Sequence, residues 1–340
     1  MNGESGTNSD KNHWIKYYSS PSHTQWQGRT DSDELERYHQ VIKFIDLLEE
    51  HIPEDDHYSF VIVGFACDEG VARNLGRTGA CHGPDKLRNF LANLPFNYAN
   101  YINVYDIGNI HCDDKNLEAA QRALGYVVEK ILLAGCHPIV LGGGHETAWG
   151  HYQGIANTDY SNDLGVINFD AHFDLRPLVN NRLGTSGTPF TQIALARQAE
   201  DLDFDYFCLG IQPTANTISL YEQAEEFDVQ FIEAQELINP SDNSHLEEFS
   251  DFVHDHDSIY LSICLDVFAS SAAPGVSAPQ PLGVMPQHLL PYLRLLAASG
   301  KVITLDIVEL APNFDQDNAT ARLAAHLLAD YINIACMTDE

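Results

Sequence analysis

The sequence predicts a three-layer αβα fold around a mainly parallel sheet of about eight strands. From residue 58 onwards, strand-like runs alternate with helical patterns, and strands separated by helices form right-handed crossovers within parallel sheets. The strand-like runs are apolar along their whole length, which is typical of strands covered by helices on both faces. Three of these runs lead directly into metal-ligating residue types, and this pattern indicates one site at one edge of the sheet.

Apolar periodicity and turn residues define the elements in order. The strands are expected at Tyr58–Gly64, Asn103–Ile107, Pro138–Leu141, Leu164–Phe169, Asp205–Gly210, Val229–Ile232, Ser258–Leu265 and Lys301–Val308. The helices between and after them are expected at Asp85–Leu94, Leu117–Ala134, Phe190–Ala199, Ile218–Glu226, Ser244–Asp255, Pro286–Ala298 and Ala319–Ile334. A further helix is expected to begin at Glu146.

Residues 1–57 are expected to form an N-terminal extension packed on a single catalytic domain at 58–340. A helix is predicted over Leu35–Glu50 because apolar residues recur on or near one helical face. These residues are Val41, Ile42, Phe44, Ile45, Leu47 and Leu48.

Composition excludes several classes of protein. The 49 Asp and Glu residues outnumber 18 Lys and Arg, and the net charge of −31 would repel nucleic acid and anionic membranes. We find no apolar run of about 18 residues and no signal-peptide pattern, so a soluble, cytoplasmic protein is expected. Seven cysteines without CxxC pairs argue against a disulfide framework and a structural zinc site.

Candidate metal ligands follow three of the predicted strands. Asp170, His172 and Asp174 alternate after Leu164–Phe169, so their side chains point the same way on extended backbone. His145 follows a run of glycines, and Cys264 and Asp266 lie two apart at the end of another strand. Because the carboxyl ends of parallel strands share one edge, we expect these residues to form one site.

Loops after the strands supply candidate binding residues. The glycine-rich segment at 68–84 contains Arg73, Asn74 and Arg77. The long segments at 176–188 and 267–283 each follow a ligand-bearing strand, and long loops in compact domains are usually functional. Taken singly, each arginine is more often structural.

The motifs occur in a specific order. Gly-Gly-His-Glu at 143–146, Asp-Ala-His-Phe-Asp at 170–174, the pair ending in Asp266, and Asp-Ile-Val-Glu at 306–309 resemble the ureohydrolase (arginase/agmatinase) family, over almost the whole chain from residue 58. The similarity also includes segments 70–84, 273–275 and 320–321.

Two departures resemble the formimidoylglutamase branch: Cys264 in place of the usual Asp, and Ser186 where arginases carry a histidine. Trp26-Gln27-Gly28-Arg29 with Asp31 agrees with that branch. The resemblance implies hydrolysis of N-formimidoyl-L-glutamate to L-glutamate and formamide in histidine degradation.

The resemblance also implies a ligand set for two manganese ions. It assigns His145, Asp170, Asp174 and Cys264 to one ion, and Asp170, His172, Cys264 and Asp266 to the other. Three carboxylates and one thiolate balance two divalent cations. Oxygen and imidazole ligands suit Mn²⁺, whereas the thiolate favours zinc or iron relative to an all-aspartate site.

Roles for further residues follow from this chemistry. A pair of ions at this site would lower the pKa of water and make hydroxide available at neutral pH. Asp174 is expected to orient that hydroxide and then to pass its proton to the departing nitrogen. Glu309 is expected to pair with the planar amidinium. Donors for the substrate carboxylates are expected among Arg73, Asn74, Arg77, Arg176 and Ser186.

Alternative functions remain open at this point. A guanidino hydrolase would release urea rather than formamide, and a non-catalytic relative would bind metal without turning over amidines. Ser186 lacks the nucleophile elbow of a serine hydrolase, and the glycines at 142–144 are not followed by the Lys-Ser/Thr of a phosphate-binding loop.

We also hypothesise that Cys67 approaches Cys264 and oxidises with it when metal is absent. A homo-oligomer is a reasonable default.

Overall fold

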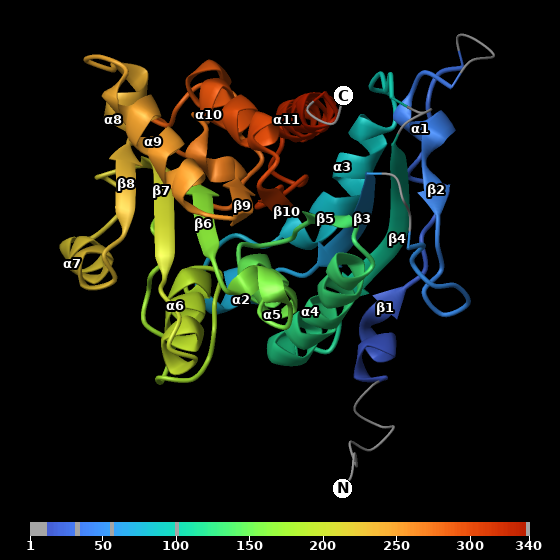
Figure 1. The fold of residues 1–340 in the computed structure, drawn as a ribbon, viewed down its shortest axis with the longest axis horizontal. Helices are drawn as coiled ribbons and strands as arrows, with labels where there is room; N and C mark the ends of the chain where they lie inside the picture. Colours follow the sequence, from blue (N-terminus) through green and yellow to red (C-terminus); the bar gives the residue numbers. More distant parts are fainter. Residues whose placement is uncertain (1–11, 31–34, 55–57, 99–101, 338–340) are drawn as a thin grey trace, which may run out of the picture.

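The computed structural model describes residues 12–30, 35–54, 58–98 and 102–337. One sheet runs through this part of the chain, with helices on both sides (Figure 1). Its strands are β1 (Tyr18–Ser19), β2 (Lys43–Phe44), β3 (Ser59–Ala66), β4 (Asn103–His111), β5 (His137–Leu141), β6 (Leu164–Phe169), β7 (Asp205–Ile211), β8 (Gln230–Glu233), β9 (Ser258–Cys264) and β10 (Val302–Val308).

The helices lie between and after these strands. They are α1 (Tyr38–Val41), α2 (Glu69–Arg73), α3 (Gly83–Leu91), α4 (Leu117–Leu133), α5 (Thr147–Ile155), α6 (Pro189–Ala199), α7 (Ile218–Glu226), α8 (Ala234–Ile238), α9 (Ser244–Asp255), α10 (Pro286–Ser299) and α11 (Ala319–Ala335). Short 3₁₀ turns occur at His13–Tyr17, Ala80–His82, Asp159–Ser161 and Leu265–Val267. None of the helices in the described ranges is long and apolar enough to cross a membrane.

Strand order positions the site. The sheet runs β1-β4-β3-β5-β10-β9-β6-β7-β8, and β2 pairs with β4 beside this path. All pairings among β3 to β10 are parallel, whereas β1 pairs antiparallel with β4. The predicted mainly parallel sheet of about eight strands is therefore confirmed, with two short strands added at one edge.

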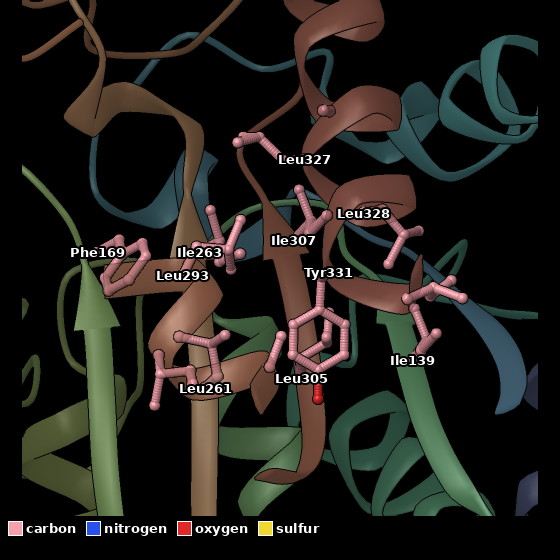
Figure 2. Packing of buried hydrophobic residues seen from close by; sticks show 14 of the residues in the cluster. Ile139, Phe169, Leu261, Ile263, Leu293, Leu305, Ile307, Leu327, Leu328 and Tyr331 are labelled. Carbon is pink, nitrogen blue, oxygen red and sulfur yellow. The ribbon is translucent and has the colours of Figure 1, made fainter. Parts of the chain in front are cut away.

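Each face of the sheet packs against its own group of helices. Leu261 and Ile263 of β9 and Leu305 and Ile307 of β10 join residues of α3 and α8–α11 in one apolar core. Figure 2 shows Leu327, Leu328 and Tyr331 of α11 on this side. The other face packs against α4–α7. Residues that alternate along a strand point to opposite faces, so neighbouring positions of β9 and β10 enter different environments.

The helix predicted over Leu35–Glu50 is wrong. The chain forms one helical turn in α1, and Ile42 is already extended before β2 pairs with β4. The backbone N–H of Ile45 then donates to the carbonyl of Asp106 at 3.1 Å. Pairing with the sheet edge satisfies backbone groups and buries Ile42 and Ile45, so tertiary contacts override the local helical pattern.

The N-terminal segment is tied to the sheet through a buried polar contact. Trp26 Nε1 donates to Asp106 Oδ2 at 2.6 Å, and Arg88 Nη2 donates to Asp106 Oδ1 at 2.8 Å. Asp106 and Arg88 are almost completely buried. These contacts, together with β1 and β2, support our proposal that residues 1–57 are an extension packed on one domain at 58–340.

We expect Asp106→Ala to lower the free energy of unfolding by about 3–5 kcal/mol, because it leaves the buried Arg88 charge without its carboxylate. Urea denaturation would measure the change. The matched control is Asp330→Ala, which breaks the more exposed pair with Arg294 and should cost less than about 1 kcal/mol. Equal losses in both variants would contradict the importance assigned to Asp106.

Candidate metal centre

The predicted ligands meet at the carboxyl ends of four neighbouring strands. His145 follows β5, Glu309 follows β10, Cys264 ends β9 and Asp170 follows β6. These strands are adjacent in the sheet in the order β5-β10-β9-β6. Because parallel strands end at a common edge, side chains more than a hundred residues apart in sequence face one another there.

Two groups of ligand atoms overlap at Asp170. One group comprises His145, Asp170 and Cys264, the other comprises Asp170, His172 and Asp266, and the atoms of each lie within 4.8 Å of one another. Asp174 joins the first group, since its Oδ2 lies 2.9 Å from His145 Nδ1. The structure thus brings all six predicted ligands together, with Asp170 shared between the groups.

Asp170 is held in place by several contacts. Its Oδ2 accepts a hydrogen bond from Asn168 Nδ2 at 3.1 Å, and its Oδ1 accepts one from the backbone N–H of His172 at 2.8 Å. His145 Nδ1 lies 2.9 Å from Oδ2 and His172 Nδ1 lies 3.3 Å from Oδ1. Burial alone would raise its pKa, but the two neighbouring histidines outweigh burial and lower it.

The other ligands are costly to ionise in this buried cluster. Burial, with the charge of Asp170, raises the pKa of Asp174, and it raises the pKa of Asp266 to about 6 although His172 opposes the shift. Burial and the surrounding carboxylates raise the pKa of the Cys264 thiol well above its usual range. Each of these shifts has the same physical origin, namely negative charge gathered away from water.

Unpartnered polar atoms show that the residues fit bound cations. His145 Nδ1, Asp266 Oδ1 and Glu309 Oε2 are buried and have no hydrogen-bond partner among the residues that the structure describes. The close approach of His145 Nδ1 to two carboxylates therefore lacks hydrogen-bond geometry. Buried polar atoms are rarely left unsatisfied, and nitrogen, oxygen and sulfur donors in overlapping groups suit two divalent ions.

Two residues at the site have strained backbone. Asp174 has φ of 48° and Glu309 has φ of 69°, a region that non-glycine residues seldom occupy. Glu309 is held there because its N–H donates to Gly143 O at 2.7 Å and its Oε1 accepts from the His145 N–H at 2.9 Å. Gly143 must be glycine, since a Cβ would lie 1.7 Å from Cys67 O. Such strain is typical of functional positions.

A cavity of about 290 Å³ lies over the ligands. Its lining includes His145, His172, Asp174, Cys264, Asp266 and Glu309, together with Asn74, Arg77, Arg176 and Ser186. The loops at 68–84, 176–188 and 267–283 all contribute to it. Larger surface hollows exist elsewhere, but the candidate ligands lie in this smaller one.

The predicted substrate contacts differ in their placement. Arg73 is absent from the cavity lining, because its guanidinium pairs with Glu118 at 2.6 Å and Glu69 at 3.3 Å. Arg77 lines the cavity, but it donates to the carbonyls of Val276 and Ser277 and so holds the 267–283 loop.

The other three predicted contacts are available at the cavity. Asn74 Nδ2 donates to Ser186 Oγ at 3.2 Å. The Arg176 guanidinium has no ion pair or hydrogen bond within the described ranges. A Cβ at Gly187 would come within 2.7 Å of Arg176 Cδ, so this glycine leaves room for the arginine.

Several supporting residues were missed by sequence reasoning. Asn168 contacts Asp170, and Ser262 contacts His145 Nε2 at 3.0 Å. Each lies two residues before a predicted ligand, so the alternation along a strand would have indicated them. Gln280 Nε2 approaches His172 Nε2 at 3.4 Å from the 267–283 loop, for which no local pattern exists.

The N-terminal segment that contributes to the family resemblance lies away from the cavity. Trp26–Arg29 packs against β4 and Asn93, and Asp31 lies outside the described residues. The pairing of Cys67 with Cys264 stays a hypothesis for the oxidised, metal-free protein. Here both cysteines are free, and Cys67 Sγ lies 3.6 Å from Glu146 Oε1.

Comparison with known proteins agrees with this geometry. Residues 58–333 match the model of the Arginase family. The chain belongs to the arginase family. A formimidoylglutamase from Legionella pneumophila (strain Lens) is 46% identical over 309 residues, which cover 91% of this chain and 95% of that protein. One from Clostridium tetani is 40% identical over 316 residues, with coverage of 91% and 93%.

Two solved structures share the fold. Trypanosoma cruzi formiminoglutamase, solved with two Mn²⁺ ions, superposes with a TM-score of 0.72 at 26% identity, covering 81% of this chain and 92% of that one. Bacillus subtilis formimidoylglutamase gives a TM-score of 0.79 at 22% identity, with coverage of 92% and 96%. Family membership and the ligand geometry together indicate a binuclear metal site.

We expect the affinity for divalent cations to fall as the pH is lowered from about 7.5 to about 5.5. Asp266, whose pKa is about 6, takes up a proton in this range, and protons compete with cations for the same ligands. The apparent Kd should rise about tenfold per pH unit for each proton displaced. Calorimetric titration of the metal-free protein at several pH values measures this, and a pH-independent Kd would contradict it.

Proposed function

We propose that the chain hydrolyses N-formimidoyl-L-glutamate to L-glutamate and formamide with a pair of Mn²⁺ ions. The observation that carries the proposal is the overlap of two ligand groups at Asp170, beneath a cavity whose wall also includes Arg176. The relatives named formimidoylglutamase, 40–46% identical over 91% of the chain, support the substrate. A place in histidine degradation is part of the same proposal.

The proposed ligands are His145, Asp170, Asp174 and Cys264 for one ion, and Asp170, His172, Cys264 and Asp266 for the other, as the family resemblance implies. When bound, the cations supply a strong nucleophile at neutral pH, because they lower the pKa of water. The Mn²⁺-bound T. cruzi neighbours support manganese. The buried Cys264 thiolate makes zinc or iron more competitive than in an all-aspartate site.

Asp174 is the proposed proton carrier. Its carboxylate lies at the cavity wall, and its side chain is 13% exposed, whereas that of Asp170 is completely buried. Burial and the charge of Asp170 raise its pKa, which suits a group that takes a proton from the attacking water and returns it to the departing nitrogen. The strained φ fixes the direction of its side chain.

Glu309 is the proposed partner of the amidinium. One carboxylate oxygen, Oε1, already accepts from the His145 N–H, while Oε2 is buried at the cavity without a partner in the described part of the chain. Burial, with Asp266 and Glu146 nearby, raises the pKa of Glu309 well above its usual range. A cationic amidinium offers N–H donors to Oε2 and stabilises the carboxylate in its charged form.

Arg176 is the proposed binding residue for a substrate carboxylate. Of the two arginines on the cavity wall, Arg77 is engaged by loop carbonyls, whereas the Arg176 guanidinium has no partner among the described residues. Guanidinium and carboxylate form strong charge-assisted pairs. Asn74 and Ser186 are bonded to each other beside it and add neutral donors. Arg73 is left out because acidic side chains already neutralise it.

The direct test is an assay of Mn²⁺-loaded protein against formimidoylglutamate, agmatine and arginine side by side. Formamide release from the first substrate is expected to exceed urea release from the other two. Urea as the main product would replace the proposal by a guanidino hydrolase, and no turnover with metal bound would replace it by a non-catalytic role.

The metal dependence of that activity is checked in the same assay. Asp170→Asn should lower kcat/KM by more than about 100-fold, because changes to mere supporting partners of metal ligands already cost 10–100-fold. Asp163→Asn, at the opposite end of β6, serves as the matched control and should retain activity. Normal activity in Asp170→Asn would refute the proposed centre.

We expect Arg176→Ala to raise KM for formimidoylglutamate about 10- to 100-fold with a smaller change in kcat, because it removes a charged contact remote from the reacting carbon. Steady-state kinetics measure both constants. The matched control is Arg182→Ala, which removes the same charge from the same loop but not from the cavity wall. An equal rise in KM for both variants would favour general electrostatics over a specific contact.

A further inference from the structure

A buried polar network lies directly beneath His145. It involves Tyr260 and Ser262 of β9, Asp306 of β10 and His151 of α5, all essentially inaccessible to solvent. These strand residues point to the face that packs on α5, opposite the apolar core of Figure 2. The network contributes no atom to the lining of the cavity, so a role in the reaction must pass through the metal ligand above it.

Three side chains converge on the carboxylate of Asp306. Ser262 Oγ donates to Oδ1 at 2.6 Å, the Tyr260 hydroxyl donates to Oδ2, and His151 Nδ1 lies 2.8 Å from Oδ2. His151 is fixed on its other side, where its Nε2 lies 2.7 Å from Thr304 Oγ1. Polar partners therefore hold both oxygens of Asp306, and the carboxylate cannot turn without breaking several buried bonds.

The direction of these hydrogen bonds determines which nitrogen of His145 carries a proton. An ionised carboxylate only accepts, so the single hydrogen of the Ser262 hydroxyl is committed to Asp306. Ser262 Oγ, 3.0 Å from His145 Nε2, must then accept from that nitrogen. Nε2 therefore keeps a proton. In the neutral ring that a metal ligand requires, the lone pair must then lie on Nδ1, the nitrogen 2.9 Å from Asp170 and Asp174.

We infer that Asp306 is a positioning residue which, through Ser262, fixes the tautomer and ring orientation of His145 so that Nδ1 is available to a cation. His151 and Tyr260 hold Asp306 in the orientation that this requires. The inference rests on the metal centre of the proposed function, not on the identity of the substrate. It assigns a role to four buried residues that touch neither substrate nor cation.

The structure distinguishes two substitutions in this network. In Asp306→Asn, the amide oxygen best accepts from Tyr260 and His151, which turns the NH₂ group toward Ser262. The Ser262 hydrogen is then free to point at His145 Nε2, which moves the imidazole proton to Nδ1 and blocks the ligating lone pair. Ser262→Ala removes the bond to Nε2 without imposing the wrong tautomer, so its effect should be smaller.

The experiment is a calorimetric titration of the metal-free, full-length variants with Mn²⁺. Asp306→Asn should weaken Mn²⁺ binding about 10- to 100-fold, and Ser262→Ala should weaken it by less. The matched control is Asp106→Asn, which alters an equally buried strand carboxylate that bonds Arg88 and Trp26 away from the site. That variant should lose stability but keep wild-type affinity.

Wild-type affinity in Asp306→Asn, or a loss no larger than in Asp106→Asn, would overturn the inference. If Asp306→Asn does not fold, Ser262→Ala decides the question, because unchanged Mn²⁺ affinity there also overturns it. The proposed function and the inference can fail separately. If the wild type binds two Mn²⁺ ions and the variants rank as expected, but formimidoylglutamate is not hydrolysed, the proposed function is refuted and the inference stands. Absence of Mn²⁺ binding by the wild type would refute both.

Discussion

Negative charge buried at one sheet edge is the constraint on which this structure depends. Asp170 is completely buried, yet its pKa is lowered because His145 and His172 lie against its two oxygens. The acids around it have raised pKa values for the opposite reason, since burial and neighbouring carboxylates disfavour their ionised forms. Divalent cations would resolve this conflict, because they neutralise the negative charge and give the unpartnered ligand atoms a cation to coordinate.

The central strands make this concentration of charge possible. Strands β5, β10, β9 and β6 are neighbours, and each supplies one side of the site at its carboxyl end. One face of β9 and β10 is hydrocarbon and packs on α10 and α11 (Figure 2). Their other face carries hydroxyl and carboxylate groups toward α5. The same alternation that builds the core thus places a polar support beneath the ligands.

The arginines near the site differ in whether neighbouring residues engage them. Arg73 is neutralised by Glu69 and Glu118, and Arg77 holds a loop through its carbonyls. Arg176 lies at the cavity without a partner in the described ranges. In a chain with a net charge of −31, a local positive group lowers the repulsion that any carboxylate would meet on approach to this cavity.

The sequence by itself determined the layers of the fold, most helix and strand positions and the six candidate ligands. Long apolar strands and motifs at strand ends are local signals, and β6, α7 and α9 have the predicted bounds. The short edge strand at Lys43–Phe44 depended on the exposed edge of β4, so the local pattern over Leu35–Glu50 was misleading. Only the tertiary structure decided which arginines are engaged by neighbours and how Asp306 supports His145. Those contacts join residues that are remote in sequence, and the spacing of residues along the chain does not indicate such partners.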